Sequence, residues 1–284
     1  MKPYSYIISK PSEIEGVISA FRSFGVKGSS LLISIFTSYT KAEGLQKMVD
    51  ALSLSFPEAE ISGMTSSVCI EQGVNHTEKI IVLFEVFEKT YVHTICFDHE
   101  PGKEEAVGCA VMSEIAKISE PLCGIEILAS QSDDRFSDFT PFLNVLTREL
   151  PTTLPVWGAL ADSQTWPDHT YVFSKKYIST AGLILRVYTG EISIMLNHVL
   201  GFRPLSRPLT VTAMDGPMII KELDHKPAVY YYDKYIHTPD FQEQSLPFPL
   251  IQQYDGYDHA HLPQGRTLDG GILFNIRCTV GTEL

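Results

Sequence analysis

The order strand, helix, strand with a glycine, strand occurs twice along the chain, and this repetition constrains the fold more than any other feature. In the first copy the apolar run Ser29–Tyr39 leads through an amphipathic stretch to EISGMTSS, which begins at Glu60. In the second copy Gly124–Asp134 leads through a similar stretch to LPVWGALADS, which begins at Leu154. Equivalent points of the two strands lie 25 residues apart in both copies. We therefore expect two related α/β units.

Apolar periodicity assigns the segments around these strands. Apolar residues recur at the helical spacing in 41–56, 102–118 and 136–150, which predicts a helix in each. Two apolar runs, 78–87 and 90–97, predict strands that pair as a hairpin. The stretch that ends the second copy, TYVFSKKYISTAGLILRVYTG, predicts two more strands.

The character of the sequence changes after Gly190. The runs 208–214 and 218–223 flank DGP, a turn signal, and predict a β-hairpin. A short helix is expected within 226–236, and Pro, Gln, Asp and Gly dominate from 237 onward. The fold class that follows is α/β (α+β): two related strand-helix-strand-strand units and then a β-rich C-terminal part. The strand-like sequence at the end indicates a chain cut from something longer.

Charge and cysteine content exclude several classes of protein. The chain has 34 acidic and 22 basic residues and a formal net charge of −12, which argues against nucleic acid or an anionic membrane surface as a partner. The five cysteines form no CxxC pair, so neither a disulfide framework nor a zinc site is expected. The N-terminus has no signal-peptide h-region, and no run has the roughly 20 apolar residues of a membrane span. We expect a soluble, cytoplasmic protein.

Four segments, in this order, resemble the FIST family of sensory domains. They are GMTSSVCIEQG from Gly63, KIIVLFEVF from Lys79, LPVWGALADS from Leu154, and GFRPLSRPLTVT from Gly201 with the downstream LDHKPAVYYY. The last is the most specific, because the family has a Gly-aromatic-Arg-Pro run before a strand that ends in Val-Thr. The order of the segments adds to the match, since the glycine motifs alone are common.

The resemblance implies a domain organisation. A FIST-N-like sensory domain would cover residues 1–224, with repeat units at about 29–97 and 124–189. The start of a FIST-C-like domain, truncated, would cover 225–284.

The resemblance also implies a function. FIST domains are sensory, ligand-binding modules of bacterial and archaeal signalling proteins, so we expect a sensor and not an enzyme. The expected ligand is a small molecule, with amino acids suggested for the family. The expected partners are output modules of cyclase, histidine-kinase or chemotaxis type, in cis or in trans. No output motif occurs in this chain, no cofactor is expected, and a homodimer is left open.

The two glycine-led segments supply the expected ligand site. Ligands of open α/β sheets bind outside the carboxyl ends of strands, where Gly63 and Gly158 would let the backbone approach a ligand. Asp162 offers a carboxylate for an ammonium group, and Arg203 a guanidinium fork for a carboxylate. The expected ligand-binding residues are Gly63, Thr65, Ser66, Ser67, Gly158, Ala159, Asp162 and Arg203. The structural alternative is two tight turns with polar caps, and an arginine that bonds main-chain carbonyl groups.

Two other functions remain open. One branch of the family is associated with haem and nitric oxide sensing. A haem would need an imidazole ligand, for which His198 is the first candidate and His93 the second, although a lone histidine in an apolar stretch is more often a core residue. The other alternative is a hydrolase that uses Cys69 or Ser66. Neither residue has a defined partner, and no GxSxG elbow occurs.

Overall fold

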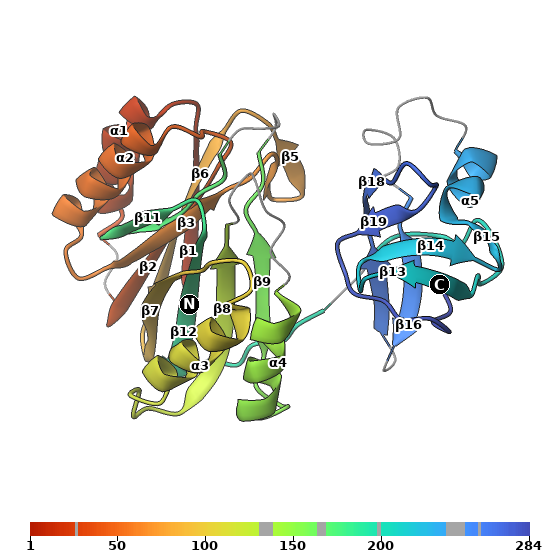
Figure 1. Cartoon of the computed structure of the whole chain (residues 1–284). Helices are drawn as coiled ribbons and strands as arrows, with labels where there is room; N and C mark the ends of the chain where they lie inside the picture. Colours follow the sequence, from red (N-terminus) through yellow and green to blue (C-terminus); the bar gives the residue numbers. More distant parts are fainter. Residues whose placement is uncertain (26–27, 131–138, 164–168, 198–199, 237–247, 255–256) are drawn as a thin grey trace. The chain divides into compact units, whose positions relative to one another are not determined.

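The structure is a computed structural model that describes residues 1–25, 28–130, 139–163, 169–197, 200–236, 248–254 and 257–284 (Figure 1). The chain divides into two compact units, Met1–Leu196 and Asn197–Leu284. Each unit encloses apolar cores of its own.

The first unit contains the same series of elements twice: strand, helix, strand, helix and four strands. The first repeat consists of β1 (Lys2–Ile8), α1 (Ile14–Ser23), β2 (Ser30–Thr37), α2 (Ala42–Ser55), β3 (Glu60–Thr65), β4 (Cys69–Glu71), β5 (Val74–His76) and β6 (Ile80–Phe87). The second consists of β7 (Thr90–Asp98), α3 (Glu104–Ile115), β8 (Leu122–Ala129), α4 (Thr140–Glu149), β9 (Val156–Leu160), β10 (Val172–Ser174), β11 (Tyr177–Ser179) and β12 (Gly182–Gly190). Each of these elements therefore has a counterpart in the other repeat.

Each repeat builds a mixed sheet with the same strand order. The first sheet contains β1-β6-β2-β3 and the second β7-β12-β8-β9. The pairs β2–β3 and β8–β9 are parallel, and the other pairs in these two series are antiparallel. Each parallel pair is joined through a helix, α2 or α4, as a βαβ crossover requires.

One hairpin crosses between the repeats. β10 and β11 belong to the second repeat by sequence, yet β10 pairs with β3 at the edge of the first sheet. The equivalent hairpin of the first repeat, β4–β5, pairs with itself. The prediction that 90–97 forms a hairpin with 78–87 is wrong, because β7 pairs with β12 in the second sheet.

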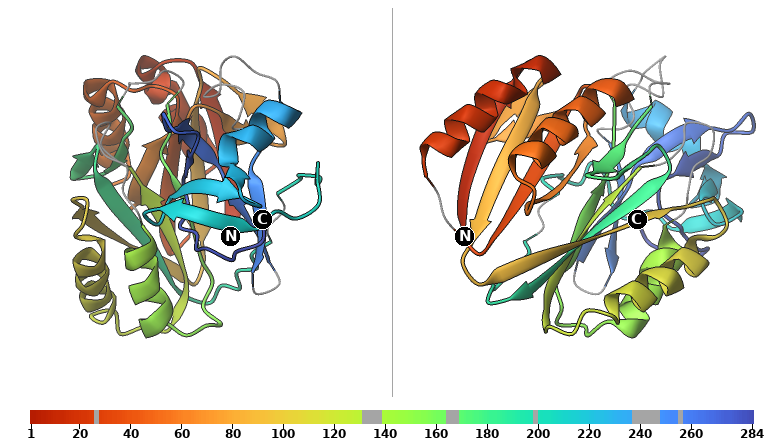
Figure 2. Two further views of the ribbon diagram at one scale, coloured as in Figure 1. Left: turned by 45° about the vertical axis from the view of Figure 1, so that its right-hand side comes forward. Right: turned by 90° about the vertical axis from the view of Figure 1, so that its left-hand side faces the viewer.

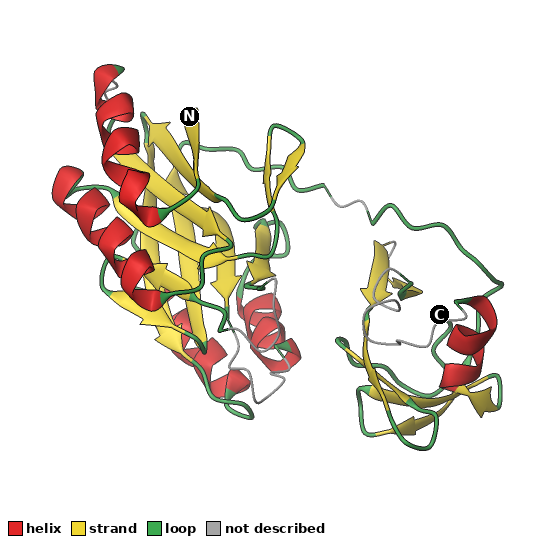
Figure 3. Ribbon diagram, turned by 90° about the horizontal axis from the view of Figure 1, so that it is seen from above, coloured by secondary structure: helices red, strands yellow, loops and turns green. Residues whose placement is uncertain are grey.

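The two sheets lie face to face between two layers of helices (Figure 2, Figure 3). α1 and α2 cover the outer face of the first sheet, in a core that includes Leu45 and Phe84. α3 and α4 cover the second sheet, in a core that includes Phe142. The inner faces meet through a third cluster, which includes Met64 and Ile184. Because both faces of each sheet are covered, the inner strands are mostly apolar, with a few polar residues such as Ser34 on β2 and Arg186 on β12.

The second unit is a small β-rich domain. Its elements are β13 (Val211–Asp215), β14 (Ile219–Leu223), β15 (Lys226–Pro227), α5 (Ala228–Tyr235), β16 (Leu250–Tyr254), β17 (Tyr257–His261), β18 (Pro263–Arg266) and β19 (Ile272–Phe274). The main sheet has the order β13-β14-β19-β18, and β16 pairs with β17. The chain end joins this unit, since the N–H of Leu284 donates to the carbonyl oxygen of Leu209 at 2.9 Å.

The mixed α/β content confirms the predicted fold class. The predicted helices are present as α2, α3, α4 and α5, and the hairpin around DGP is β13–β14. The predicted start of the third helix, 136–138, lies outside the described residues.

Candidate functional site

The exits of β3 and β9 meet in the first unit. Ser67, two residues after β3, donates a hydrogen bond from Oγ to Oδ2 of Asp162, two residues after β9, over 2.5 Å. The main-chain N–H of Asp162 donates to the carbonyl oxygen of Thr65 at 3.2 Å. Two segments that are 95 residues apart in the sequence are thus adjacent loops.

Ser67 and Asp162 occupy the same position in the two repeats. Gly63 in β3 and Gly158 in β9 each lie opposite an isoleucine of the parallel neighbour strand. Ser67 and Asp162 each follow their glycine by four residues. Their contact therefore joins equivalent points of a pseudo-symmetric pair.

The main-chain amides of Thr65, Ser66, Ala161 and Asp162 at the two exits are engaged within the fold. The N–H of Ser66 donates to the last carbonyl oxygen of β2 at 2.8 Å, and that of Ala161 donates to the last one of β8 at 2.6 Å. The N–H of Thr65 donates to the carbonyl oxygen of Tyr171 at 2.9 Å, and that of Tyr171 donates to Oγ1 of Thr65 at 2.9 Å. These four amides are therefore not available to a ligand, which would bind through side chains where it lies against them.

The side chains at the exits provide one carboxylate and two hydroxyl groups. Asp162 is exposed, while Ser66 and Ser67 are half-buried. Oγ of Ser66 donates to the carbonyl oxygen of Val68 at 2.7 Å. A carboxylate accepts hydrogen bonds only, so this combination matches a cationic donor such as an ammonium group. Thr65 is fully buried and holds the exit together.

Gly63 and Gly158 lie within strands, so the interpretation of both as turn residues is wrong. A Cβ at Gly63 would overlap the carbonyl oxygen of Ile35 and the ring of Phe173, and a Cβ at Gly158 would overlap the carbonyl oxygen of Ile127. Both glycines thus permit close packing of neighbouring strands. Gly158 and its neighbour Ala159 are exposed at the edge of the second sheet, whereas Gly63 is buried.

Arg203 lies in the second compact unit, while the other seven expected ligand-binding residues lie in the first. Its side chain is exposed on the wall of a cavity of about 1070 Å³, whose aromatic lining includes Tyr231, Tyr235 and Phe248. We therefore assign Arg203 to the cavity of its own unit.

The haem alternative depends on two histidines, of which the structure describes one. His198 lies outside the described residues. Nε2 of His93, on β7, is 3.3 Å from Oγ1 of Thr189, and neither of the two described cavities has a histidine in its described lining. Within the described part of the chain no three His, Cys, Asp or Glu side chains are grouped to hold a metal ion.

Cys69 is poorly suited to act as a nucleophile. Its side chain is buried, and burial raises the pKa of its thiol to about 11. The reactive species is the thiolate, which is scarce at neutral pH when the pKa is raised. Ser66, the other candidate of the hydrolase alternative, donates its hydroxyl hydrogen to a carbonyl oxygen and not to a base.

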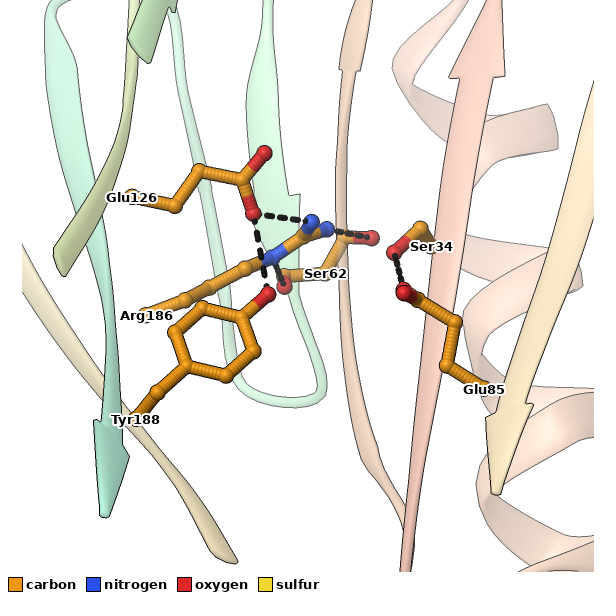
Figure 4. A network of polar contacts seen from close by, with 6 residues as sticks. All are labelled: Ser34, Ser62, Glu85, Glu126, Arg186 and Tyr188. Atoms are coloured by element: carbon orange, nitrogen blue, oxygen red, sulfur yellow. Dashed lines mark hydrogen bonds and ion pairs between the residues drawn. The ribbon is translucent and has the colours of Figure 1, made fainter. Parts of the chain in front are cut away.

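The structure contains a polar network between the two sheets that the sequence analysis did not predict. Arg186 on β12 is 1% exposed, and it reaches across to β3 (Figure 4). Nε donates to Oγ of Ser62 at 2.8 Å and Nη2 to its carbonyl oxygen at 2.9 Å. Nη1 pairs with Oε2 of Glu126 on β8 at 2.9 Å, and the hydroxyl of Tyr188 donates to the same oxygen at 3.3 Å. The network thus ties the second sheet to the first.

Glu85 on β6 adds a second half-buried carboxyl group near this network. Oγ of Ser34 donates to its Oε2 at 3.3 Å. Burial raises the pKa of Glu85, and the charge of Arg186 opposes that rise in part. The sequence contained one signal: Glu126 and Arg186 interrupt apolar strands, and buried charges are normally paired.

Comparisons with known proteins identify the family of the chain. None of the described helices combines the length and the apolar character needed to cross a lipid bilayer. A comparison with curated proteins finds no match. The family model described as FIST N domain matches residues 31–226 of the 284 residues. The match covers more than half of the chain, which therefore belongs to the FIST family of sensory domains of signalling proteins.

Proposed function

We propose that the chain senses a small cytoplasmic metabolite that carries an ammonium group, such as an amino acid or a related amine, at the exits of β3 and β9. The observation that carries this proposal is the hydrogen bond from Ser67 to Asp162. The carboxylate of Asp162 would receive the ammonium group, and the hydroxyl groups of Ser66 and Ser67 would bond neighbouring polar atoms of the ligand.

The position of this site between the two repeats suits a sensor, because ligand binding there could change the arrangement of the repeats. Ser67 belongs to the first repeat and Asp162 to the second, so a ligand held by both would favour one arrangement of the repeats. A ligand shifts such an equilibrium only by its difference in affinity for the two states. The output module that reads the change is of cyclase, histidine-kinase or chemotaxis type, in cis or in trans. No cofactor is required.

A ligand series in three parts tests the proposal. Titration calorimetry would compare amino acids, the corresponding amines without the carboxyl group, and the corresponding acids without the amino group. The proposal expects binding whenever the amino group is present. Removal of the Asp162 charge in Asp162→Asn should weaken binding roughly tenfold or more, since hydrogen bonds to charged groups contribute about 1.5–3 kcal/mol.

Asp50→Asn is the matched control, because Asp50 is exposed on α2 and accepts a hydrogen bond from Gln46. Binding that survives Asp162→Asn unchanged, or that depends on the carboxyl group alone, would contradict the proposed site. The same protein with added haemin checks the haem alternative. A Soret band at stoichiometric haemin, lost in His198→Ala, would replace the metabolite proposal by a haem sensor.

A further inference from the structure

The edge strand β9 of the second sheet has one paired neighbour in the described part of the chain. Among the described residues β9 pairs with β8 alone, at the end of the order β7-β12-β8-β9. Its bonds to β8 use alternate residues, as in the donation from Ile125 to Pro155 and from Ala161 to Ala129. The main-chain groups of residues 156, 158 and 160 therefore point away from β8. An edge of this kind is a template for another strand.

The equivalent edge of the first sheet is covered. β10 pairs with β3 in the antiparallel direction, with Val172 opposite Met64 and Phe173 opposite Gly63. Phe173 is 1% exposed, and its ring approaches Gly63 closely. Since β10 comes from the second repeat, one repeat completes the sheet of the other.

The β4–β5 hairpin is the counterpart of β10–β11. Both hairpins stand between the third and the last strand of their repeat, and both have strands of three residues joined by two. The registers also agree, because Ile70 lies opposite Asn75 as Phe173 lies opposite Ile178. Ile70 therefore corresponds to the buried Phe173.

The two hairpins differ in their burial. Ile70 is 69% exposed and Val74 is 56% exposed, in contrast to the buried Phe173. The hairpin is held near β1 by a hydrogen bond from Oγ of Ser5 to Oε1 of Glu71 at 2.6 Å. The hairpin thus buries Cys69, which is 4% exposed, but leaves Ile70 and Val74 exposed, and it lies in the same unit as an edge strand that has one partner among the described residues.

We propose that β4–β5 docks on β9 as an antiparallel strand and completes the second sheet as β10–β11 completes the first. The register that the repeat dictates places Cys69 opposite Ala159 and Ile70 opposite Gly158. We choose the β4–β5 hairpin as the partner of β9 because the chain already places it near the β9 edge. Cys69 follows Ser67 by two residues, and Ser67 is bonded to Asp162 just beyond β9.

The hairpin is then a two-position strap. In one position Glu71 bonds Ser5, and in the other β4 pairs with β9. A segment with two discrete arrangements is the kind of element through which a bound ligand produces a large change. The coupling to the ligand rests on the proposed function, whereas the docking itself does not.

A disulfide trap tests the docked register. In β3–β10 the pair Thr65–Tyr171 is hydrogen-bonded, so the next pair, Met64–Val172, is not. Cys69 and residue 159 would form the equivalent non-hydrogen-bonded pair, with Cα atoms about 4.5 Å apart, within the range of a disulfide. Ala159→Cys should therefore form an intramolecular disulfide with the native Cys69 under mild oxidation, identified by peptide mapping.

Leu160→Cys is the matched control, because its side chain points to the opposite face of the strand. The proposal expects Ala159→Cys to cross-link about tenfold faster or more, from proximity in the docked state. Disulfide-linked dimers through position 159 would assign the edge to a second copy of the chain and overturn the proposal. Equal rates for the two variants would overturn it as well.

Hydrogen exchange supplies a second readout that needs no thiol chemistry. Ile70→Asp should accelerate exchange in peptides that span 156–160, because the docked state loses its apolar contact. Leu54→Asp, at an exposed position of α2, is the control and should leave those peptides unchanged. Exchange over 156–160 that is identical in the wild type and Ile70→Asp would contradict docking. Metabolite binding is absent from both assays, so a failure of the proposed function would leave them unaffected.

Discussion

Oγ of Ser67 donates to Oδ2 of Asp162 across 2.5 Å, and the two residues hold the same position in the two repeats of the first unit. A contact between equivalent positions of two repeats is expected close to the pseudo-symmetry axis that relates them. The two side chains differ, so the contact has one neutral and one negative side. A ligand that bridges it would bind in a single orientation and touch both repeats.

Removal of Arg186 from its network should destabilise the fold, because the groups that it bonds would lose their partner. Arg186→Leu leaves the half-buried carboxylate of Glu126 without its cation and with only the Tyr188 hydroxyl among the contacts described above. The cost should approach, as an upper limit, the value of about 3–5 kcal/mol for breaking a fully buried pair. Urea unfolding should show this decrease in the free energy of unfolding. Arg148→Leu breaks an exposed pair with Glu149 and should change stability by less than about 1 kcal/mol. A similar small effect of Arg186→Leu would show that the network contributes little.

Glu85 should make stability fall as the pH rises. Burial raises its pKa in the folded protein above the ordinary value of 4.5. Above pH 4.5 the unfolded chain releases a proton that the folded protein retains, so the free energy of unfolding decreases until the pH passes the raised pKa. Glu85→Gln should lack this decrease. Urea unfolding of both proteins between pH 4 and pH 8 measures the difference. For one titrating group, the free energy of unfolding changes by about 1.4 kcal/mol per pH unit at most.

Glu88→Gln is the control for this experiment, because Glu88 is exposed just beyond β6. It should keep the pH dependence of the wild type. A pH profile of Glu85→Gln that coincides with the wild-type profile would mean that Glu85 titrates alike in both states.

Local periodicity was sufficient for α2, α3, α4 and α5 and for many strands, but β1 and α1 were not predicted and the partner of β7 was wrong. A connection of two residues, Glu88 and Lys89, separates β6 from β7, and short connections suggest hairpins. Tight two-residue hairpins favour residues such as Asn-Gly that accept positive φ, which Glu-Lys does not supply. Long-range pairing decided the outcome, because β7 aligns along β12 over nine residue pairs.

The candidate site could be predicted in part. The repeat was enough to suggest that the segments around Ser67 and Asp162 meet, since like positions of related units tend to face each other. The glycines were misread because a glycine inside a strand and a glycine in a turn look alike in sequence. Arg186 was missed because an apolar run with one charge still reads as a strand, and its partner Ser62 is 124 residues away.

The two strand glycines should differ in their tolerance of a methyl group. Gly63 is buried between β2 and β10, so Gly63→Ala forces its Cβ against a carbonyl oxygen and the Phe173 ring and should lower stability by about 1–3 kcal/mol. Gly158 lies on an edge strand that can shift, so Gly158→Ala should cost less. Thermal unfolding compares the two variants with Gly16→Ala, a helical position with no heavy atom within 4 Å, which should be neutral or stabilising. An equal loss in both strand variants would contradict the argument from edge freedom.

The second unit should lose stability in mild acid because of His261. This residue is fully buried, its Nε2 lies 3.0 Å from Oε1 of Gln252, and burial lowers the pKa of its imidazole from 6.5 to about 4. Between pH 6.5 and pH 4 the unfolded chain binds a proton that the folded unit refuses, so the free energy of unfolding falls as the pH is lowered, by about 3 kcal/mol over the whole window. Hydrogen exchange of β16 and β17, corrected for intrinsic rates, should report this loss.

His261→Leu should abolish the acid-dependent loss of protection, because the leucine side chain does not titrate. The matched control is His225→Asn, an exposed position at which φ is 61° and asparagine tolerates that backbone conformation. It should retain the wild-type response. Protection of β16 and β17 that stays constant from pH 6.5 to pH 4 in the wild type would show that His261 does not limit the acid stability of the second unit.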